Sequence, residues 1–96
     1  MKNLNELDKQ DSDVSAIELF KGGIGIVTAI NIKRNGTLKQ HITKTPALLI
    51  CVSGTINYED ENEQQFKLEQ GDFVNILPNV KHWLYATVSS QLVLIK

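Results

Sequence analysis

The sequence predicts an all-β protein with a single domain, built as a sandwich or closed barrel of short strands. Its 96 residues suffice for one domain and are too few for two. Apolar and polar residues alternate with a period of two in short runs, and no run favours a helix over a strand. Turn signals separate these runs every ~8–12 residues, a spacing typical of sandwiches and barrels.

The first 13 residues differ in composition from the rest of the chain. They are polar and charged, and they show no strong apolar pattern beyond Leu4 and Leu7. We therefore expect residues 1–13 to form a flexible or partner-bound arm, and residues 14–96 to form the β domain.

The amino-terminal half of the β domain contains a long period-two alternation. An aliphatic or Thr residue recurs at every second position of 24–32: Ile24, Ile26, Thr28, Ile30 and Ile32. This pattern predicts a strand, and the glycines just before it predict a bend or bulge. Asn35-Gly36 predicts a type I′ hairpin leading to the next strand, because both residues tolerate positive φ.

The carboxy-terminal half continues with further short strands and turns. The expected strands are 47–52, 55–58, 66–68, 73–77, 82–87 and 91–95. Turns are expected at Gly54, Gly71 and Pro78-Asn79, and 59–65 is expected to be a solvated hairpin tip. Carboxylates are therefore expected in turns and not inside the domain.

The composition argues against several classes of function. The net charge is −1 and no basic cluster is present, so we expect neither nucleic acid nor a membrane surface as partner. The longest apolar run, 47–52, is far shorter than the ~20 residues of a membrane helix, and the first residues lack a signal-like apolar core. The one cysteine, Cys51, cannot form an intrachain disulfide and is expected in the core. These features favour a cytoplasmic protein.

The two histidines of the chain each lie at a set distance from a glycine. His41 precedes Gly54 by thirteen residues, and His82 follows Gly71 by eleven. Two strand-like runs and a polar turn lie between them. In a small β-barrel this arrangement can bring both imidazoles to one place, so we expect the functional site there.

These two segments resemble the two sequence motifs of the cupin family. His41 and Gly54 match the first histidine and the glycine of the first motif, and Gly71 and His82 keep the interval of the second. The likeness covers roughly residues 16–96. It implies a single-domain cupin-type double-stranded β-helix, which is a jelly-roll barrel.

The chain departs from the family at the metal ligands. In cupins that bind a metal, three histidines and a glutamate converge on the ion. Here Thr43 and Ala47 stand at the positions of the second histidine and the glutamate, and Asn79 stands at a turn glycine. The resemblance therefore implies at most a two-histidine site, formed by His41 and His82, for a divalent transition metal such as Zn, Fe, Mn or Ni.

Three roles for the histidines remain open. The first is a pocket that binds a small polar or anionic ligand through both imidazoles. The second is a metal-dependent enzyme of isomerase, lyase or oxygenase type, and the third is a buried pair with hydrogen-bond partners and no ligand. The missing metal ligands favour the first, and strand parity predicts this lining for the pocket: His41, Thr43, Ala47, Leu49, His82 and Leu84.

Strand parity also predicts a surface for a partner. If His82 faces inward, Trp83 and Tyr85 face outward. They would join the outward-facing aliphatic residues of 48–52, namely Leu48, Ile50 and Val52. This is more apolar surface than a monomer usually exposes, so a homodimer is expected unless these side chains form the second half of a sandwich core.

Overall fold

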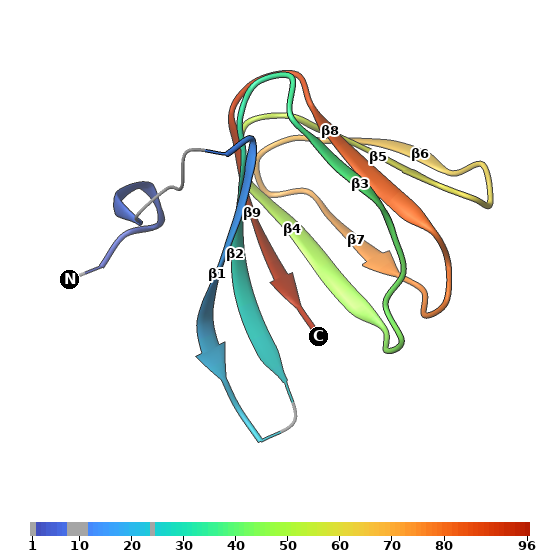
Figure 1. The fold of residues 1–96 in the computed structure, drawn as a ribbon, viewed down its shortest axis with the longest axis horizontal. Helices are drawn as coiled ribbons and strands as arrows, with labels where there is room; N and C mark the ends of the chain where they lie inside the picture. The colour runs from blue at the N-terminus through green and yellow to red at the C-terminus, as the bar shows by residue number, and fades with distance from the viewer. Residues whose placement is uncertain (1, 8–11, 24) are drawn as a thin grey trace.

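The computed structural model describes residues 2–7, 12–23 and 25–96, and it confirms the all-β fold class (Figure 1). One turn of 3₁₀ helix, η1, spans Leu4–Glu6. In the described residues no helix has the length and hydrophobicity needed to cross a bilayer. The strands are β1 Val14–Lys21, β2 Ile26–Ile32, β3 Thr37–His41, β4 Ala47–Ser53, β5 Ile56–Asp60, β6 Gln65–Leu68, β7 Phe73–Ile76, β8 His82–Ala86 and β9 Ser90–Ile95.

The strands form two antiparallel sheets. One sheet has the order β1-β2-β9-β4-β7, and the other has the order β3-β8-β5-β6. Only β1–β2 and β5–β6 are hairpins of consecutive strands, and every other connection passes from one sheet to the other. This alternation between two layers is the jelly-roll arrangement expected from the sequence.

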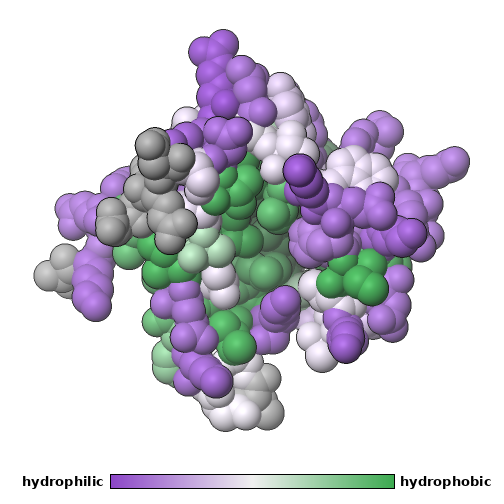
Figure 2. Space-filling view, in the orientation of Figure 1, coloured by the Kyte–Doolittle hydropathy of each residue, from purple (hydrophilic) through white to green (hydrophobic). Residues whose placement is uncertain are grey.

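The two ends of this barrel differ. At one end, which we call the open end, β3 and β9 stop while β4 and β8 start, and it lies at the bottom of Figure 1. At the other, the closed end, four connections between the described strands join the two sheets, namely β2–β3, β4–β5, β6–β7 and β8–β9, whereas only β3–β4 and β7–β8 do so at the open end. Figure 2 shows hydrophobic side chains in the middle of the view, over β9 and β4, between hydrophilic side chains on both flanks.

The core fills the space between the sheets with residues of one strand parity. Leu49 and Cys51 of β4 are buried while Leu48 and Ile50 are partly exposed, so the alternation seen in the sequence follows the pleat. Cys51 is fully buried, which confirms it as a core residue. The fully buried aliphatic residues contribute roughly 1.5–3 kcal/mol each to folding, and they are Ile32, Leu49, Ile56, Leu84 and Leu92.

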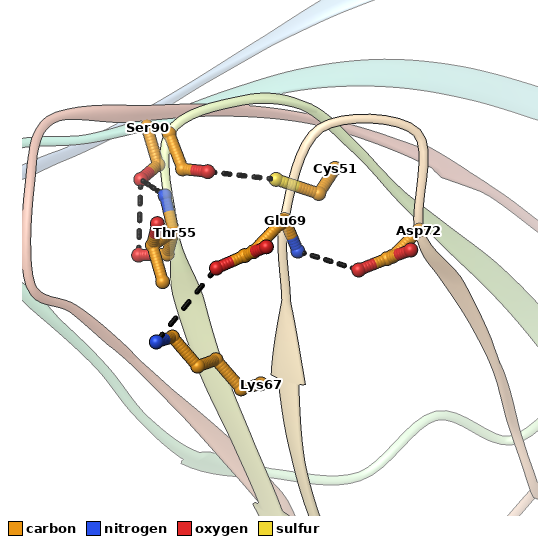
Figure 3. Close-up of polar contacts among 7 residues, drawn as sticks. Cys51, Thr55, Lys67, Glu69, Asp72 and Ser90 are labelled. Carbon is orange, nitrogen blue, oxygen red and sulfur yellow. Dashed lines mark hydrogen bonds and ion pairs between the residues drawn. The ribbon is translucent and has the colours of Figure 1, made fainter.

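The closed end is held by glycine backbones and satisfied polar groups (Figure 3). Gly54 has φ +91°, and a Cβ there would clash with Ser90 Oγ and lie 2.7 Å from Ser89 O. Ser90 Oγ accepts from Thr55 N at 3.0 Å and donates to Val88 O at 2.8 Å. In the adjoining turn, Asp72 accepts from the backbone N of Glu69 at 2.8 Å. Gly54 and Gly71 thus lie in turns, as predicted.

The expected hairpin at Asn35-Gly36 is wrong. β2 and β3 belong to different sheets, so this turn crosses between layers. Asn35 has φ +66°, but Gly36 N donates to Lys33 O at 2.7 Å, which makes residues 34 and 35 the central pair. Gly36 is required for a different reason, because a Cβ there would lie 2.8 Å from Lys33 O. Dipeptide preferences are local and cannot tell which sheet the next strand joins.

The expected apolar surface is also divided between the sheets. Trp83 and Tyr85 lie on β8 of the four-stranded sheet, whereas the outward residues of β4 belong to the five-stranded sheet. The predicted single patch of Trp83, Tyr85, Leu48, Ile50 and Val52 therefore does not exist. Parity gives the face of a strand but not the sheet that contains it.

The described part of the amino-terminal segment lies against the five-stranded sheet. Gln91 Nε2 donates to Asn5 Oδ1 at 2.8 Å, and Leu4 and Leu7 line a small cavity together with Ile17 and Ala29. Residues 8–11 lie outside the described residues, as does Ile24 of the predicted strand. The division of the chain at residues 13 and 14 remains a prediction.

Candidate functional site

The two histidines are direct neighbours at the open end. His41 is the last residue of β3 and His82 is the first residue of β8, and they pair across the antiparallel ladder. Their ring centroids are 4.1 Å apart with an interplanar angle of 61°. His82 is 2% exposed and His41 is partly buried. Both rings therefore share one environment, although 40 residues separate them in the sequence.

Backbone carbonyls determine which ring nitrogen carries the proton. His41 Nδ1 lies 3.0 Å from Lys39 O, and His82 Nδ1 lies 3.2 Å from Val80 O. A carbonyl oxygen only accepts hydrogen bonds, so each Nδ1 must donate and each neutral ring has its lone pair on Nε2. Neither Nε2 has a hydrogen-bond partner among the described residues.

The surroundings of His82 favour its neutral form. Burial lowers its pKa from the usual value, and the charges of His41 and Lys96 lower it further. The carbonyl of Val80 and the charge of Asp60 oppose this shift without reversing it. At neutral pH His82 is therefore uncharged, and its Nε2 can accept a hydrogen bond.

A small cavity adjoins both rings. Its volume is about 20 Å³, which is room for one water-sized group. Apart from the imidazoles it is entirely aliphatic, and its lining is Ile30, Leu38, His41, Leu49, Ile76, His82, Leu84 and Leu94. The two imidazoles thus contribute to the lining of a hydrophobic cavity that is too small for a whole organic ligand.

Four of the six residues predicted to line the pocket are in this lining: His41, Leu49, His82 and Leu84. The other two, Thr43 and Ala47, are buried but do not line it. Ala47 packs in the core. Thr43 lies beyond the end of β3, and its backbone O accepts from Asn79 N at 2.8 Å. Asn79 has φ +63°, which confirms the predicted left-handed turn position.

Thr43 has an unusual side chain for a buried residue. It is 3% exposed, and its Oγ1 is the one buried side-chain N or O atom without a hydrogen-bond partner in the described part of the chain. An unsatisfied buried hydroxyl costs roughly 1–3 kcal/mol. The open end therefore carries three polar atoms without partners in the described residues, namely this hydroxyl and the two Nε2 atoms.

Sequence reasoning missed a carboxylate in the same row. Asp60 pairs with His82 across β5 and β8 and is 6% exposed, so the expectation that carboxylates stay in turns is wrong here. It accepts from Tyr58 Oη at 3.3 Å and from the backbone N of Asn62 and Gln64. The shared parity of Ile56, Tyr58 and Asp60 was the available signal.

Tyr58 connects Asp60 to the imidazoles. Its ring stacks on His82 with centroids 5.9 Å apart and an interplanar angle of 20°. Burial, followed by the charge of Asp60, raises the pKa of Tyr58 to about 12, so its hydroxyl stays protonated and donates to Asp60. The tyrosine and the carboxylate thus support the position of His82 from the side away from His41.

The residues present do not fit the metal centre that the cupin resemblance implies. A catalytic zinc site uses three protein ligands and a structural site uses four. Among the described residues no three His, Cys, Asp or Glu side chains are grouped closely enough to hold an ion. Cys51 does not add a ligand, because its Sγ lies at the closed end, 3.6 Å from Ser53 O and 3.8 Å from Gly54 O. His41 and His82 are left as a pair of ligands only.

Solved structures of similar fold confirm the architecture. A cupin superfamily protein from Desulfitobacterium hafniense DCB-2 matches with a TM-score of 0.85 at 10% identity, over 97% of this chain and 84% of the other. A cupin-2 domain containing protein from Shewanella frigidimarina NCIMB 400 matches with 0.80 at 16% identity, over 99% and 92%. KdgF from a Halomonas species matches with 0.79 at 18% identity, over 95% and 86%.

At these identities the likeness concerns the fold alone. The protein has the cupin fold, and the fold implied by the resemblance of its motifs is confirmed. No family model and no curated protein matches the chain. Because one fold hosts many activities, function must be argued from the site.

Proposed function

We propose that this protein binds a small organic molecule at the open end, with a hydrogen-bond donor of the ligand held by Nε2 of His41 and His82. The observation that carries the proposal is the shared tautomer of the two rings. Both Nδ1 atoms contact carbonyls, which leaves Nε2 as the acceptor of each neutral ring, and both residues line one cavity of about 20 Å³.

The size and lining of the cavity restrict what enters it. A hydroxyl or an uncharged amine group fits the available volume, whereas a longer body does not. The aliphatic walls exclude charged groups, because burying a charge without a partner is costly. The ligand therefore places one neutral donor between the rings, and the rest of it extends toward the open end.

A purely structural role explains the site less well. Polar groups with a purely structural role have protein partners, as the Ser90 hydroxyl has at the closed end, whereas the described residues leave Nε2 of each imidazole free to accept from a group outside the protein. Here Tyr58 and Asp60 stabilise His82 while no described residue satisfies its Nε2. A ligand supplies the missing donor.

A fragment screen tests the proposal. Hydroxyl- and amine-bearing fragments of up to six heavy atoms should shift the backbone amide resonances of residues 41 and 82. His82→Phe, which keeps an aromatic ring against Tyr58, should abolish these shifts. Trp83→Phe changes the next residue, whose side chain bonds Glu59 on the outer face, and should leave them intact.

The proposal is contradicted if no fragment shifts these resonances, or if the hits bind His82→Phe equally well. Metal analysis distinguishes the alternative. If protein purified without a chelator holds one transition metal per chain, and both His41→Ala and His82→Ala lose it, a metal-dependent enzyme replaces the binding module.

The outer face of the five-stranded sheet supports a homodimer as the working form. Two rows of cross-strand neighbours run over the outer face of this sheet, and neither row contains a charged side chain. Two copies of the chain can therefore meet there without removing charged groups from water. The part of this outer apolar face that the amino-terminal segment leaves uncovered consists of Phe20, Val27, Leu48, Ile50, Phe73, Val93 and Ile95.

Light scattering checks the dimer. The unmodified protein should have the mass of two chains at micromolar concentration, and Ile50→Glu should reduce it to one. Tyr85→Glu places the same charge on the outer face of the other sheet and should leave the dimer intact. A monomeric unmodified protein, or dissociation by Tyr85→Glu alone, contradicts the assignment.

A further inference from the structure

A second concave region lies at the open end, next to the histidine cavity. It is a surface groove of about 610 Å³ between the β1–β2 connection, the segment after β3 and the end of β9. Thr43, two residues after His41, lines the groove, and so does Lys96, two residues after Leu94. Two residues of extended chain span about 7 Å. The groove therefore begins about that far beyond the cavity.

The groove is basic. Lys21, Lys44 and Lys96 line it, and none of the described lining residues is Asp or Glu. Lys21 and Lys44 alone give the groove a net positive charge. The charge of Lys96 also reaches His82, whose pKa it lowers, so the groove and the cavity are electrostatically connected.

Thr43 provides an independent indication of a ligand. Its hydroxyl is buried without a partner, and the residue lines the basic groove. A hydroxyl can donate to an anionic oxygen, and hydrogen bonds to charged groups are about twice as strong as neutral ones. The hydroxyl itself has almost no accessible surface, so a bound anion would satisfy it after the Thr43 side chain turns toward the groove.

We infer that the ligand of the two-histidine cavity carries an anionic group, a carboxylate or a phosphate, and that Lys21, Lys44 and the hydroxyl of Thr43 bind this group in the groove. The inference rests on the proposed function and extends it. One end of the ligand donates to the two Nε2 atoms, and its short apolar body lies along Ile26 and Ile42. The anionic group then lies about 7–10 Å from the donor.

Probes of matched length test the inference. 6-Hydroxyhexanoate and 6-hydroxyhexyl phosphate carry a hydroxyl and an anion at about this separation, and 1,6-hexanediol is the uncharged match. Titrations followed by backbone amide shifts give the affinity of each probe. We expect both anionic probes to bind more tightly than the diol, and the better of the two identifies the headgroup.

Variants assign the effect to the groove. Lys21→Gln and Lys44→Gln should each weaken the anionic probes by about two- to fivefold, which is typical of one solvent-exposed ion pair. Thr43→Val should weaken them as well, and none of the three should change binding of the diol. Lys67→Gln removes the same charge from β6, outside the groove, and serves as the control.

The outcomes separate the two proposals. If the diol shifts the resonances of residues 41 and 82 while the anionic probes bind no better, the inference is overturned and the proposed function stands. If the anionic probes bind at the lysines without affecting residues 41 and 82, one ligand does not occupy both sites, and the inference fails. If the lysine variants affect all probes equally, the groove does not select an anion.

Discussion

The closed and open ends of this barrel differ in how their polar side-chain atoms are satisfied. At the closed end, the Ser90 hydroxyl bonds Thr55 N and Val88 O, and Gly54 fits closely against Ser89 and Ser90. At the open end, the Thr43 hydroxyl and Nε2 of His41 and His82 have no partner in the described structure. The difference indicates that one end stabilises the fold and the other is shaped to receive a ligand.

The largest expected effect is at the closed end. Gly54→Ala should lower the free energy of unfolding by roughly 2–5 kcal/mol, because it combines an unfavourable φ with a clash against Ser90. Gly71→Ala is the matched control. Gly71 has φ +90°, but a Cβ there meets nothing within 4 Å, so only the backbone cost of ~1–2 kcal/mol remains. Urea denaturation of both variants gives the difference, and equal losses would contradict close packing at Gly54.

Removal of a hydroxyl should have opposite consequences at the two ends. Ser90→Ala leaves Thr55 N without its acceptor and should cost roughly 1–3 kcal/mol. Thr43→Val removes an unsatisfied buried hydroxyl with little change of shape, so stability should stay the same or rise by up to about 2 kcal/mol. Thermal and urea unfolding measure both. If Thr43→Val destabilises as much as Ser90→Ala, the two ends do not differ as described.

Acidification should affect the open end through His82. Its pKa is lower in the folded protein than in the unfolded chain, where it is about 6.5, so the unfolded chain binds more protons below that pH. The free energy of unfolding should therefore fall as the pH drops below about 6.5. His82→Phe should lose part of this dependence and Trp83→Phe should keep it. Equal pH dependence in His82→Phe and the unmodified protein would refute this role of burial.

Much of the fold followed from the sequence, because strand parity and turn residues act locally. The parity of 82–86 placed His82, Leu84 and Ala86 inward, and Asn79 took its left-handed turn. Sheet membership did not follow. The Asn35-Gly36 turn and the divided apolar patch both depend on which distant strand pairs with which, and dipeptides and parity do not encode this.

The site was predictable to a similar extent. Spacing and family resemblance brought His41 and His82 together, but the size of the cavity also depends on aliphatic side chains from four other strands. The burial of Asp60 was missed because its run of acidic neighbours resembles a solvated turn. The proton positions on the two rings depend on backbone carbonyls, and only a three-dimensional structure shows those contacts.

Long-range proton–nitrogen NMR of histidine-labelled protein, at a pH where both rings are neutral, examines the central claim most directly. It reports which ring nitrogen of His41 and His82 carries hydrogen. The contacts with Lys39 O and Val80 O predict a protonated Nδ1 and an unprotonated Nε2 in both rings. A proton on Nε2 of either ring would remove one of the two acceptors and overturn the proposed binding mode.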